Sequence, residues 1–339
     1  MLPLTLPILR LLSDGEFHSG EVLAAQLGVS RASIWNALRD IELWGIELYK
    51  VRGRGYQMPI PIEWYEYEKI VPHLAQQAEQ LQLQILDVAE STNSLLLKSI
   101  VQGEGHGRCL VAEMQTHGRG RRGRSWQSAL GGSLSFSVLW QFNVGVSQLS
   151  GLSLAVGVAL ARALRELGVS DIQLKWPNDV LHSYHKLGGV LIELQGDALG
   201  PSATVVGVGL NYRLSAQVKN RIDQAVIDLC SIKSDIASRN QILGVTLRHL
   251  SEVLSIFAQQ GFRVLRQEWL KLHVYQDKPV TLRMPDGSEI PGIVRDVSEE
   301  GLLILDTASG ACRFGSGEIS LRPNNKTTGY LNAPHAARH

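Results

Sequence analysis

The 339-residue chain has few of the features that mark an exported, zinc-stabilised or membrane-spanning protein. Its three cysteines, Cys109, Cys230 and Cys312, are far apart and form no Cys-x-x-Cys or Cys/His pattern, which argues against a disulfide framework and a zinc site. The apolar start at residues 1–7 lacks a basic segment, and no apolar run approaches the ~18 residues of a membrane span. We therefore expect a cytoplasmic protein without a membrane anchor.

An excess of either charge is also lacking, because 33 Lys and Arg residues face 32 Asp and Glu residues, for a formal net charge of +1. Any binding of phosphate or nucleic acid must therefore depend on local clusters of basic residues. With 44% hydrophobic residues, the chain can build two or three domains with their own cores.

Acidic residues are missing altogether between Glu113 and Glu166. Residues 115–126 of this stretch, here called the arginine loop, read Gln-Thr-His-Gly-Arg-Gly-Arg-Arg-Gly-Arg-Ser-Trp. Glycines turn backbone N–H groups toward one concavity, guanidinium groups bind phosphate or carboxylate, and Trp126 offers a flat face for a ring. The loop is typical of a site for a phosphate-bearing small molecule with an aromatic part. The alternative is a flexible basic arm that contacts nucleic acid without specificity.

Residues 1–60 have the pattern of a winged helix-turn-helix domain. We predict helices at 8–12 and 21–27, a third helix capped by Ser30 and running to about Trp44, and strands at 46–51 and 56–58. The alternative is a three-helix protein-interaction domain. Acidic and basic residues balance in this segment, so one copy would bind DNA weakly and dimerisation would be needed. The DNA-binding candidates are Ser30, Arg31, Ser33, Asn36, Arg39, Arg52 and Arg54.

Residues 61–273 predict a central α+β domain with a mixed sheet. We expect a helix at 62–83 broken at Pro72, followed by strands at 85–89, 108–114, 134–140, 172–175, 189–194 and 204–210, with 172–175 and 189–194 as a pair. Further helices are expected at 94–101, 148–167, 240–260 and 262–272. Short strands and glycine turns at 274–323 predict a small SH3-like β-barrel, and the polar tail at 324–339 is expected to be disordered.

Two polar segments of the central domain stand out. Ser91, Thr92 and Asn93 can cap the helix that follows and can also offer polar groups to a ligand at its N-terminus. Lys186 precedes Gly188 and Gly189, so a point charge and an unobstructed backbone could approach a ligand together. The alternatives are a simple helix cap and a surface lysine.

These segments, taken in order, resemble one family over nearly the whole chain: the bifunctional biotin protein ligases and biotin operon repressors. The resemblance rests on residues 91–93, the arginine loop, 175–179 (Lys-Trp-Pro-Asn-Asp), 186–189 (Lys-Leu-Gly-Gly), 207–211 (Gly-Val-Gly-Leu-Asn) and 317–322 (Gly-Glu-Ile-Ser-Leu-Arg). The sequence departs from the family at Ser133, where relatives often have Asn.

The resemblance implies a ligase that converts biotin and ATP to biotinyl-5′-AMP and transfers the biotinyl group to a lysine of the biotin carboxyl carrier protein, an acetyl-CoA carboxylase subunit. It implies ATP, biotin and Mg²⁺ as ligands. Lys186, Arg121 and Arg119 would be catalytic. The biotin site would comprise Ser91, Thr92, Asn93, Gln115, Gly118, Arg119, Arg121, Lys186, Gly188 and Gly189. The ATP and adenylate site would comprise Arg121, Arg124, Trp126, Asp179, Lys186, Asn211 and Arg322, with Asp179 orienting an arginine or helping to hold Mg²⁺.

The resemblance also implies regulation. A loop of this length is costly to order, so adenylate would order it and build a homodimer surface that places two winged domains on operator DNA and represses biotin synthesis genes. Two other classes remain open on the residues alone. One is a lipoate or octanoyl ligase of related architecture, and the other is a ligand-sensing repressor without catalysis.

Overall fold

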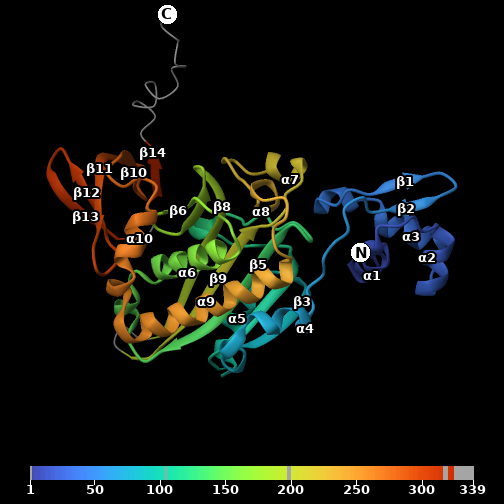
Figure 1. The fold of residues 1–339 in the computed structure, drawn as a ribbon, viewed down its shortest axis with the longest axis horizontal. Coiled ribbons are helices and arrows are strands. Elements are labelled where there is room, and N and C mark those ends of the chain that lie inside the picture. The colour runs from blue at the N-terminus through green and yellow to red at the C-terminus, as the bar shows by residue number, and fades with distance from the viewer. Residues whose placement is uncertain (1, 104, 197–199, 316–319, 324–339) are drawn as a thin grey trace, which may run out of the picture.

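The structure, a computed structural model, describes residues 2–103, 105–196, 200–315 and 320–323. A small helical unit with a hairpin lies at one end of the molecule, a large sheet covered by helices occupies the middle, and a second sheet lies at the other end (Figure 1). The predicted multidomain α+β architecture is therefore confirmed. The predicted disordered tail at 324–339 and residues 317–319 lie outside the described residues.

The N-terminal unit is a helix-turn-helix followed by a two-stranded hairpin. Its elements are α1 (Leu2–Leu11), α2 (Gly20–Leu27), α3 (Arg31–Leu38), β1 (Tyr49–Val51) and β2 (Gly55–Gln57). Ser19 and Ser30 cap α2 and α3 by accepting the N–H groups of Val22 and Ser33, and Gly28 adopts φ 65° where α2 turns into α3. Ile34 and Leu38 of α3 are fully buried, as their spacing predicts.

Several predicted boundaries in this unit were wrong. The first helix begins at Leu2, and the first strand of the hairpin is confined to Tyr49–Val51. The third helix ends at Leu38, and a separate 3-10 turn spans Ile41–Trp44. The buried side chains of Ile34, Leu38 and Ile41 continue across this break at the helical spacing, so the apolar pattern could not reveal it.

The segment between the N-terminal unit and the sheet is not the predicted broken helix. It holds one short helix, α4 (Tyr67–Ile70), and 3-10 turns at Val71–His73 and Ala75–Gln80. Extended backbone precedes α4, where the N–H groups of Tyr65 and Glu66 donate to the side chains of Glu113 and Asn240. These long-range bonds replace the bonds that a helix would make within itself.

The central sheet has seven strands in the order β3-β4-β5-β9-β8-β7-β6. Their bounds are β3 (Gln82–Ala89), β4 (Arg108–Gln115), β5 (Ser133–Phe142), β6 (Ile172–Lys175), β7 (Asp179–His182), β8 (His185–Gly196) and β9 (Ser202–Asn211). Only β3 and β4 are parallel, which confirms the mixed sheet. The predicted direct pairing of 172–175 with 189–194 was wrong, because β7 lies between β6 and β8.

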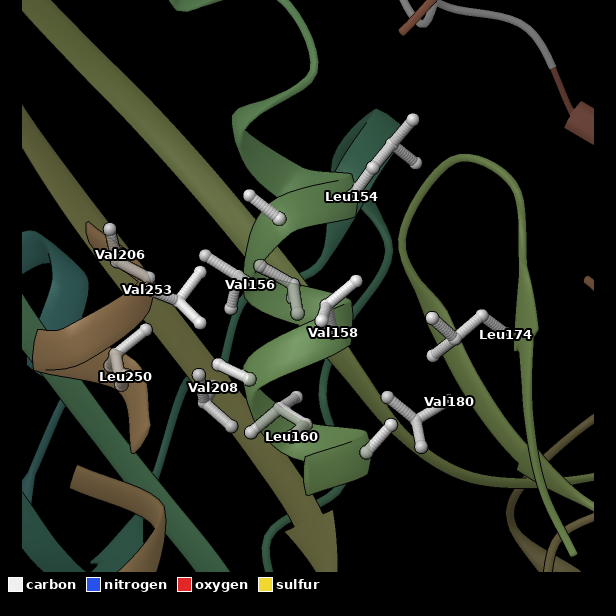
Figure 2. Packing of buried hydrophobic residues seen from close by; sticks show 14 of the residues in the cluster. Leu154, Val156, Val158, Leu160, Leu174, Val180, Val206, Val208, Leu250 and Val253 are labelled. Carbon is white, nitrogen blue, oxygen red and sulfur yellow. The ribbon is translucent and has the colours of Figure 1, made fainter. Parts of the chain in front are cut away.

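Helices α6 (Leu152–Glu166) and α9 (Arg239–Gln260) cover one face of the sheet (Figure 1). Figure 2 shows α6 side chains between Leu174 and Val180 on one side and Val206, Val208, Leu250 and Val253 on the other. The stretch Val146–Glu166 is apolar and long enough to cross a membrane, but 61% of its most apolar window is buried in this packing, as in a core helix. The predicted helix at 148–167 begins later, after a 3-10 turn at Val146–Leu149.

The remaining helices are α5 (Thr92–Val101), α7 (Ala216–Asn220), α8 (Leu229–Ile232) and α10 (Arg266–Leu272). Strands β10 (Pro279–Arg283), β11 (Glu289–Val297), β12 (Leu303–Thr307), β13 (Gly310–Phe314) and β14 (Ser320–Pro323) form an antiparallel sheet in the order β13-β12-β11-β10-β14. Gly287, Gly301 and Gly310 take positive φ at the predicted turns. The SH3-like barrel is not confirmed, since no pairing among the described strands closes this sheet.

The N-terminal unit is docked on the central one. Ile62, Trp64 and Leu130 belong to the same buried cluster as the core of the helix-turn-helix. The guanidinium of Arg10 lies 4.2 Å from the Trp64 ring centroid and donates to Asp87 at 2.6 Å. Apolar packing, a cation–π contact and an ion pair thus join the two units.

A fully buried ion pair joins α9, β4 and the segment before α4. Arg239 donates to Glu113 at 2.9 Å and to the backbone oxygens of Glu63 and Ser133, and Glu113 also accepts the N–H of Tyr65. Both charged side chains are 0% exposed. Burial of two charges is tolerated because each has several partners, so removal of one would leave the other uncompensated.

We predict that Glu113→Gln lowers the free energy of unfolding by about 3–5 kcal/mol, because it leaves Arg239 as an unpaired buried charge. Urea unfolding measures this change. The matched control is Glu289→Gln, which breaks an Arg283 pair whose side chains are 55% and 53% exposed and should cost less than about 1 kcal/mol. Equal losses in the two variants would contradict the prediction.

Candidate active site

The side chains on one face of three adjacent strands are small, and they form the floor of a cavity. Residues alternate along β5, so Phe136 and Val138 face the core under α6 and α9, while Ser135 and Ser137 face the other way. Cross-strand pairing puts Ser135, Gly209 and Gly189 in one row across β5, β9 and β8, and Ser137, Gly207 and Leu191 in the next row on that face. The floor therefore leaves room for a flat ligand against the backbone.

The N-terminus of α5 forms one wall. The Oε1 of Gln115 accepts the N–H of Thr92 at 2.7 Å and its hydroxyl at 3.1 Å. The Thr92 hydroxyl contacts the Ser137 hydroxyl at 2.6 Å, and Ser137 donates to the Oδ1 of Asn93 at 2.6 Å. Ser91 caps the helix by accepting the N–H of Ser94. The residues predicted as a cap are therefore both a cap and part of a polar network.

The arginine loop forms another wall as a tight hairpin. Trp126 donates its N–H to Gly118 at 2.8 Å, and Gly120 donates to Arg124 at 2.7 Å. The Trp126 indole lies on Gly209, where an added Cβ would come within 2.5 Å of the ring. Its Nε1–H is buried and has no hydrogen-bond partner among the described residues. The indole is thus held at the cavity with a donor available.

One carboxylate lies among several cations. The Nζ atoms of Lys186 and Lys175 lie 2.7 Å and 3.8 Å from the Asp179 carboxylate, and Arg121 donates to Asn178 at 3.2 Å. Burial alone would raise the pKa of Asp179, but Lys186 and Lys175 outweigh it and hold the pKa below its usual value. Burial lowers the pKa of Lys175, an effect that Asp179 opposes and neighbouring cations strengthen. The site has a surplus of positive charge.

These elements enclose a cavity of about 500 Å³. It brings together most of the predicted site residues: Ser91, Thr92, Asn93, Gln115, Arg119, Arg121, Arg124, Trp126, Asp179, Lys186, Gly189, Asn211 and Arg322. Arg322 comes from β14, so the C-terminal sheet contributes a cation to the cavity. Residues 221–224, which follow α7, also line the cavity.

Two of the predicted site residues, Gly188 and Gly118, have structural roles, as does Ser133. An added Cβ on Gly188 would lie 2.5 Å from Leu210 and 2.6 Å from the Gly209 carbonyl, so Gly188 allows close strand packing. Gly118 is buried under the Trp126 backbone in the same way. Ser133, the departure from the family pattern, is fully buried and accepts the N–H of Ala129 at 3.1 Å in the turn before β5.

Asn211 and Arg119 are bound to protein groups. The Asn211 amide donates to the backbone oxygens of Lys186 and Ile227, which fixes the strand that carries Lys186. Arg119 forms an ion pair with Glu193 at 2.9 Å. The sequence reasoning missed Glu193 and Ser137. The alternation of serines with core residues along 133–138 could have indicated Ser137, whereas no sequence pattern marked Glu193.

The residues around Asp179 do not fit a metal ion held by the protein alone. Mg²⁺ prefers several oxygen ligands, whereas Asp179 offers one carboxylate already shared by two lysines. The described residues contain no group of three or more His, Cys, Asp or Glu side chains that could hold a metal ion.

The predicted DNA-binding residues lie on the exposed side of α3 and at the hairpin tip. Arg31 pairs with Glu21 at 2.8 Å, and Ser33 is held by the Ser30 cap. Asn36, Arg39 and Arg52 are exposed. The sequence reasoning missed Trp35, which is 55% exposed on α3.

Two contacts modify this surface. The Arg39 guanidinium lies 5.8 Å from the Trp35 ring centroid, and that of Arg54 lies 4.0 Å from the Phe17 ring centroid. Both arginines are thus oriented by aromatic side chains while their charges remain exposed.

Three family models match successive parts of the chain. They are described as HTH domain over residues 5–57, Biotin/lipoate A/B protein ligase family over 85–211, and Biotin protein ligase C terminal domain over 277–322. The matched ranges coincide with the helix-turn-helix, the sheet that carries the cavity, and the C-terminal sheet.

Similar proteins cover the same length. The bifunctional ligase/repressor BirA of Salmonella typhimurium (strain LT2) is 37% identical over 94% of this chain and 97% of its own length, and that of Escherichia coli (strain K12) is 35% identical over 95% and 98%. The structure of a biotin protein ligase from Aquifex aeolicus in complex with biotin and ATP matches with a TM-score of 0.62 and 31% identity, covering 72% of this chain and 99% of that one.

We predict that Asp179→Asn destabilises the protein at neutral pH and that the difference from the parent shrinks as the pH falls below about 4. The pKa of Asp179 is lower in the folded state than in the unfolded state, so its stabilisation is present above the unfolded pKa and is lost as the pH falls through the folded pKa. Urea unfolding between pH 3 and 7 measures the difference. A gap between the two proteins that stays constant down to pH 3 would contradict the prediction.

Proposed function

Because this chain belongs to the family of bifunctional biotin protein ligases and repressors, we propose that its cavity activates biotin with ATP and transfers the biotinyl group to a carrier protein. In the first step, a biotin carboxylate oxygen attacks the α-phosphorus of ATP, and the bond to pyrophosphate breaks. In the second step, an acceptor lysine amine attacks the carbonyl carbon of biotinyl-5′-AMP. An amide forms, AMP leaves and the amine loses a proton.

The observation that carries this proposal is the surplus of cations around Asp179, above a floor of small residues. The first step brings a carboxylate and a triphosphate together, so two anions must approach each other and charge builds on the phosphoryl oxygens. Fixed cations lower that barrier without having to reorganise. Lys186 and Arg121, which face Asp179 and Asn178, are proposed as the catalytic cations.

The polar wall at α5 supports a role in binding the biotin ureido ring. Gln115 uses its oxygen for Thr92, so its amide nitrogen is the group it offers a ligand. Ser91 and Thr92 lie at a helix N-terminus, where backbone N–H groups favour a carbonyl oxygen or an anion. Gly189 leaves the floor open beside them. Asn93 instead makes its bonds to protein groups and fixes this wall.

For the nucleotide, Trp126 offers a ring face and its buried Nε1–H, while Arg124 and Arg322 add positive charge. Asn211 is proposed to keep Lys186 in place beside the adenylate. We propose that Mg²⁺ enters bound to ATP, since the residues around Asp179 do not fit a metal held by the protein alone. The fit of a biotin-specific C-terminal family model and the full-length relatives favours biotin over lipoate.

We predict that Lys186→Ala folds normally but forms biotinyl-5′-AMP about a hundredfold more slowly, the scale expected for loss of one preorganised charge. Release of pyrophosphate from ATP and biotin measures the rate. Lys69→Ala is the matched control, because Lys69 is 59% exposed on α4 and should leave the rate unchanged. If Lys186→Ala reacts at the parent rate, Lys186 is only a surface charge.

The helix-turn-helix unit makes the same protein a repressor of biotin synthesis genes. Its exposed α3 face and the Arg52 hairpin tip suit a major-groove helix with a wing on the backbone. One copy has balanced charge and gains little from phosphate neutralisation, so we propose that a homodimer binds a two-fold operator. Adenylate bound at the arginine loop would favour the dimer, and the cytoplasm is the proposed compartment because operator DNA and carrier protein are both there.

We predict that biotinyl-5′-AMP strengthens dimerisation, and through it operator affinity, by at least tenfold, or about 1.4 kcal/mol. Added carrier protein should lower the occupancy of the DNA. Sedimentation and gel-shift titrations with and without adenylate measure the two effects.

Point variants of the full chain are the better controls here, because removal of residues 1–60 would expose Ile62, Trp64 and Leu130. Arg52→Ala should weaken operator binding while the dimer constant stays the same. If adenylate does not change the dimer constant, the proposed link between ligand and DNA is wrong.

A further inference from the structure

Arg119 and Glu193 form an ion pair at the edge of the cavity. Arg119 extends from the arginine loop and lines the cavity, and Glu193 lies on β8, two residues beyond the lining residue Leu191. The guanidinium pairs with both carboxylate oxygens, through Nη2 to Oε1 at 2.9 Å and Nη1 to Oε2 at 3.2 Å. Nη1 also donates to the Ser94 hydroxyl at 3.4 Å. One side chain thus ties the loop to both β8 and α5.

Glu193 lies at the end of the cavity floor. Alternation along β8 puts Gly189, Leu191 and Glu193 on the same face of the strand. Gly189 and Leu191 line the cavity and pair with Gly209 and Gly207. Glu193 pairs with Val205, which belongs to the apolar cluster under α5. The ion pair therefore lies where the open floor ends and α5 begins.

The carboxylate also fixes the polar wall. Glu193 accepts from the Asn93 amide at 2.9 Å, and Asn93 in turn accepts from Ser137. The Glu193 side chain is 19% exposed and that of Arg119 is 48% exposed, so the pair is partly shielded from solvent. A continuous set of hydrogen bonds runs from the arginine loop through Glu193 to the wall that carries Thr92 and Gln115.

We propose that Glu193 is a positioning residue, and that the Arg119–Glu193 pair is a strap that closes the cavity over bound biotin and slows its escape. The proposal rests on the proposed biotin site. Arg119 then serves to retain the ligand, because its charge is neutralised by a bidentate carboxylate. Lys186 and Arg121 supply the charge for the reaction, and the strap holds the loop against β8 and α5.

A double-mutant cycle in the full-length protein tests the strap. Glu193→Gln keeps an oxygen that can accept from Asn93 but removes the charge, and Arg119→Ala removes the other partner. Each single variant should release labelled biotin about fivefold faster and raise the biotin KM by a similar factor. In Glu193→Gln the rate of adenylate formation at saturating biotin should stay within about twofold of the parent. The double variant should be no worse than either single one.

Two further variants separate retention from a general loss of structure. Glu193→Asp restores the charge on a shorter side chain and should recover part of the retention. Glu289→Gln, which breaks the exposed Arg283 pair in the C-terminal sheet, should leave biotin release unchanged.

The outcomes are distinct. Biotin release from Glu193→Gln at the parent rate overturns the strap, as does an Arg119→Ala variant whose saturated rate of adenylate formation falls well below that of Glu193→Gln. In the second case Arg119 acts on the reacting atoms. Additive effects in the double variant also overturn it. A parent protein that does not bind biotin overturns the proposed function, and the strap with it.

Discussion

The cavity depends on one constraint: the strands of the central sheet that form its floor must carry small side chains on that face. Gly207 and Gly209 satisfy this constraint in two ways. A Cβ on Gly207 would come within 2.1 Å of the Asn93 Oδ1, and one on Gly209 would press on the Trp126 ring. The same glycines thus allow both walls, through Asn93 and Trp126, to close onto the sheet. The opposite face of these strands is packed with large apolar residues, so the floor stays rigid although its side chains are small.

Two carboxylates pair with the cations around this floor. Asp179 is the only carboxylate in contact with Lys186 and Lys175 within the described part of the chain, and it keeps two like charges close together before any anion arrives. Glu193 pairs with a single cation, Arg119, beside α5. The two carboxylates therefore hold different cations, Lys175 and Lys186 in one case and Arg119 in the other. The number of arginines in the loop does not indicate these two pairings.

The sequence was most informative at positions where the backbone needs one residue type, either to cap a helix or to leave space for a neighbouring group. The caps at Ser30 and Ser91 and the unobstructed backbone at Gly189 could each be predicted, because few other residues suit those positions. It was least informative where long-range contacts override local preference. The segment 62–83 contains helix-forming residues, yet its N–H groups bind Glu113 and Asn240, far away in the chain. Glu193 could not be found because a strand residue acquires its partner only when the arginine loop folds across it.

The docking of the N-terminal unit has a consequence for the DNA it binds. Ile62, Trp64 and Leu130 are buried in the same cluster as the core of the helix-turn-helix, and Arg10 contacts Trp64 and Asp87. These contacts hold the helix-turn-helix against the central unit, so the two are not joined by a flexible linker alone. In a dimer, the distance and the rotation between the two recognition helices are then set by the protein. B-DNA turns by about 34–36° per base pair, so one base pair added between two half-sites would turn one of them away from its helix. Such a dimer would therefore select operators by the spacing of their half-sites as well as by their sequence.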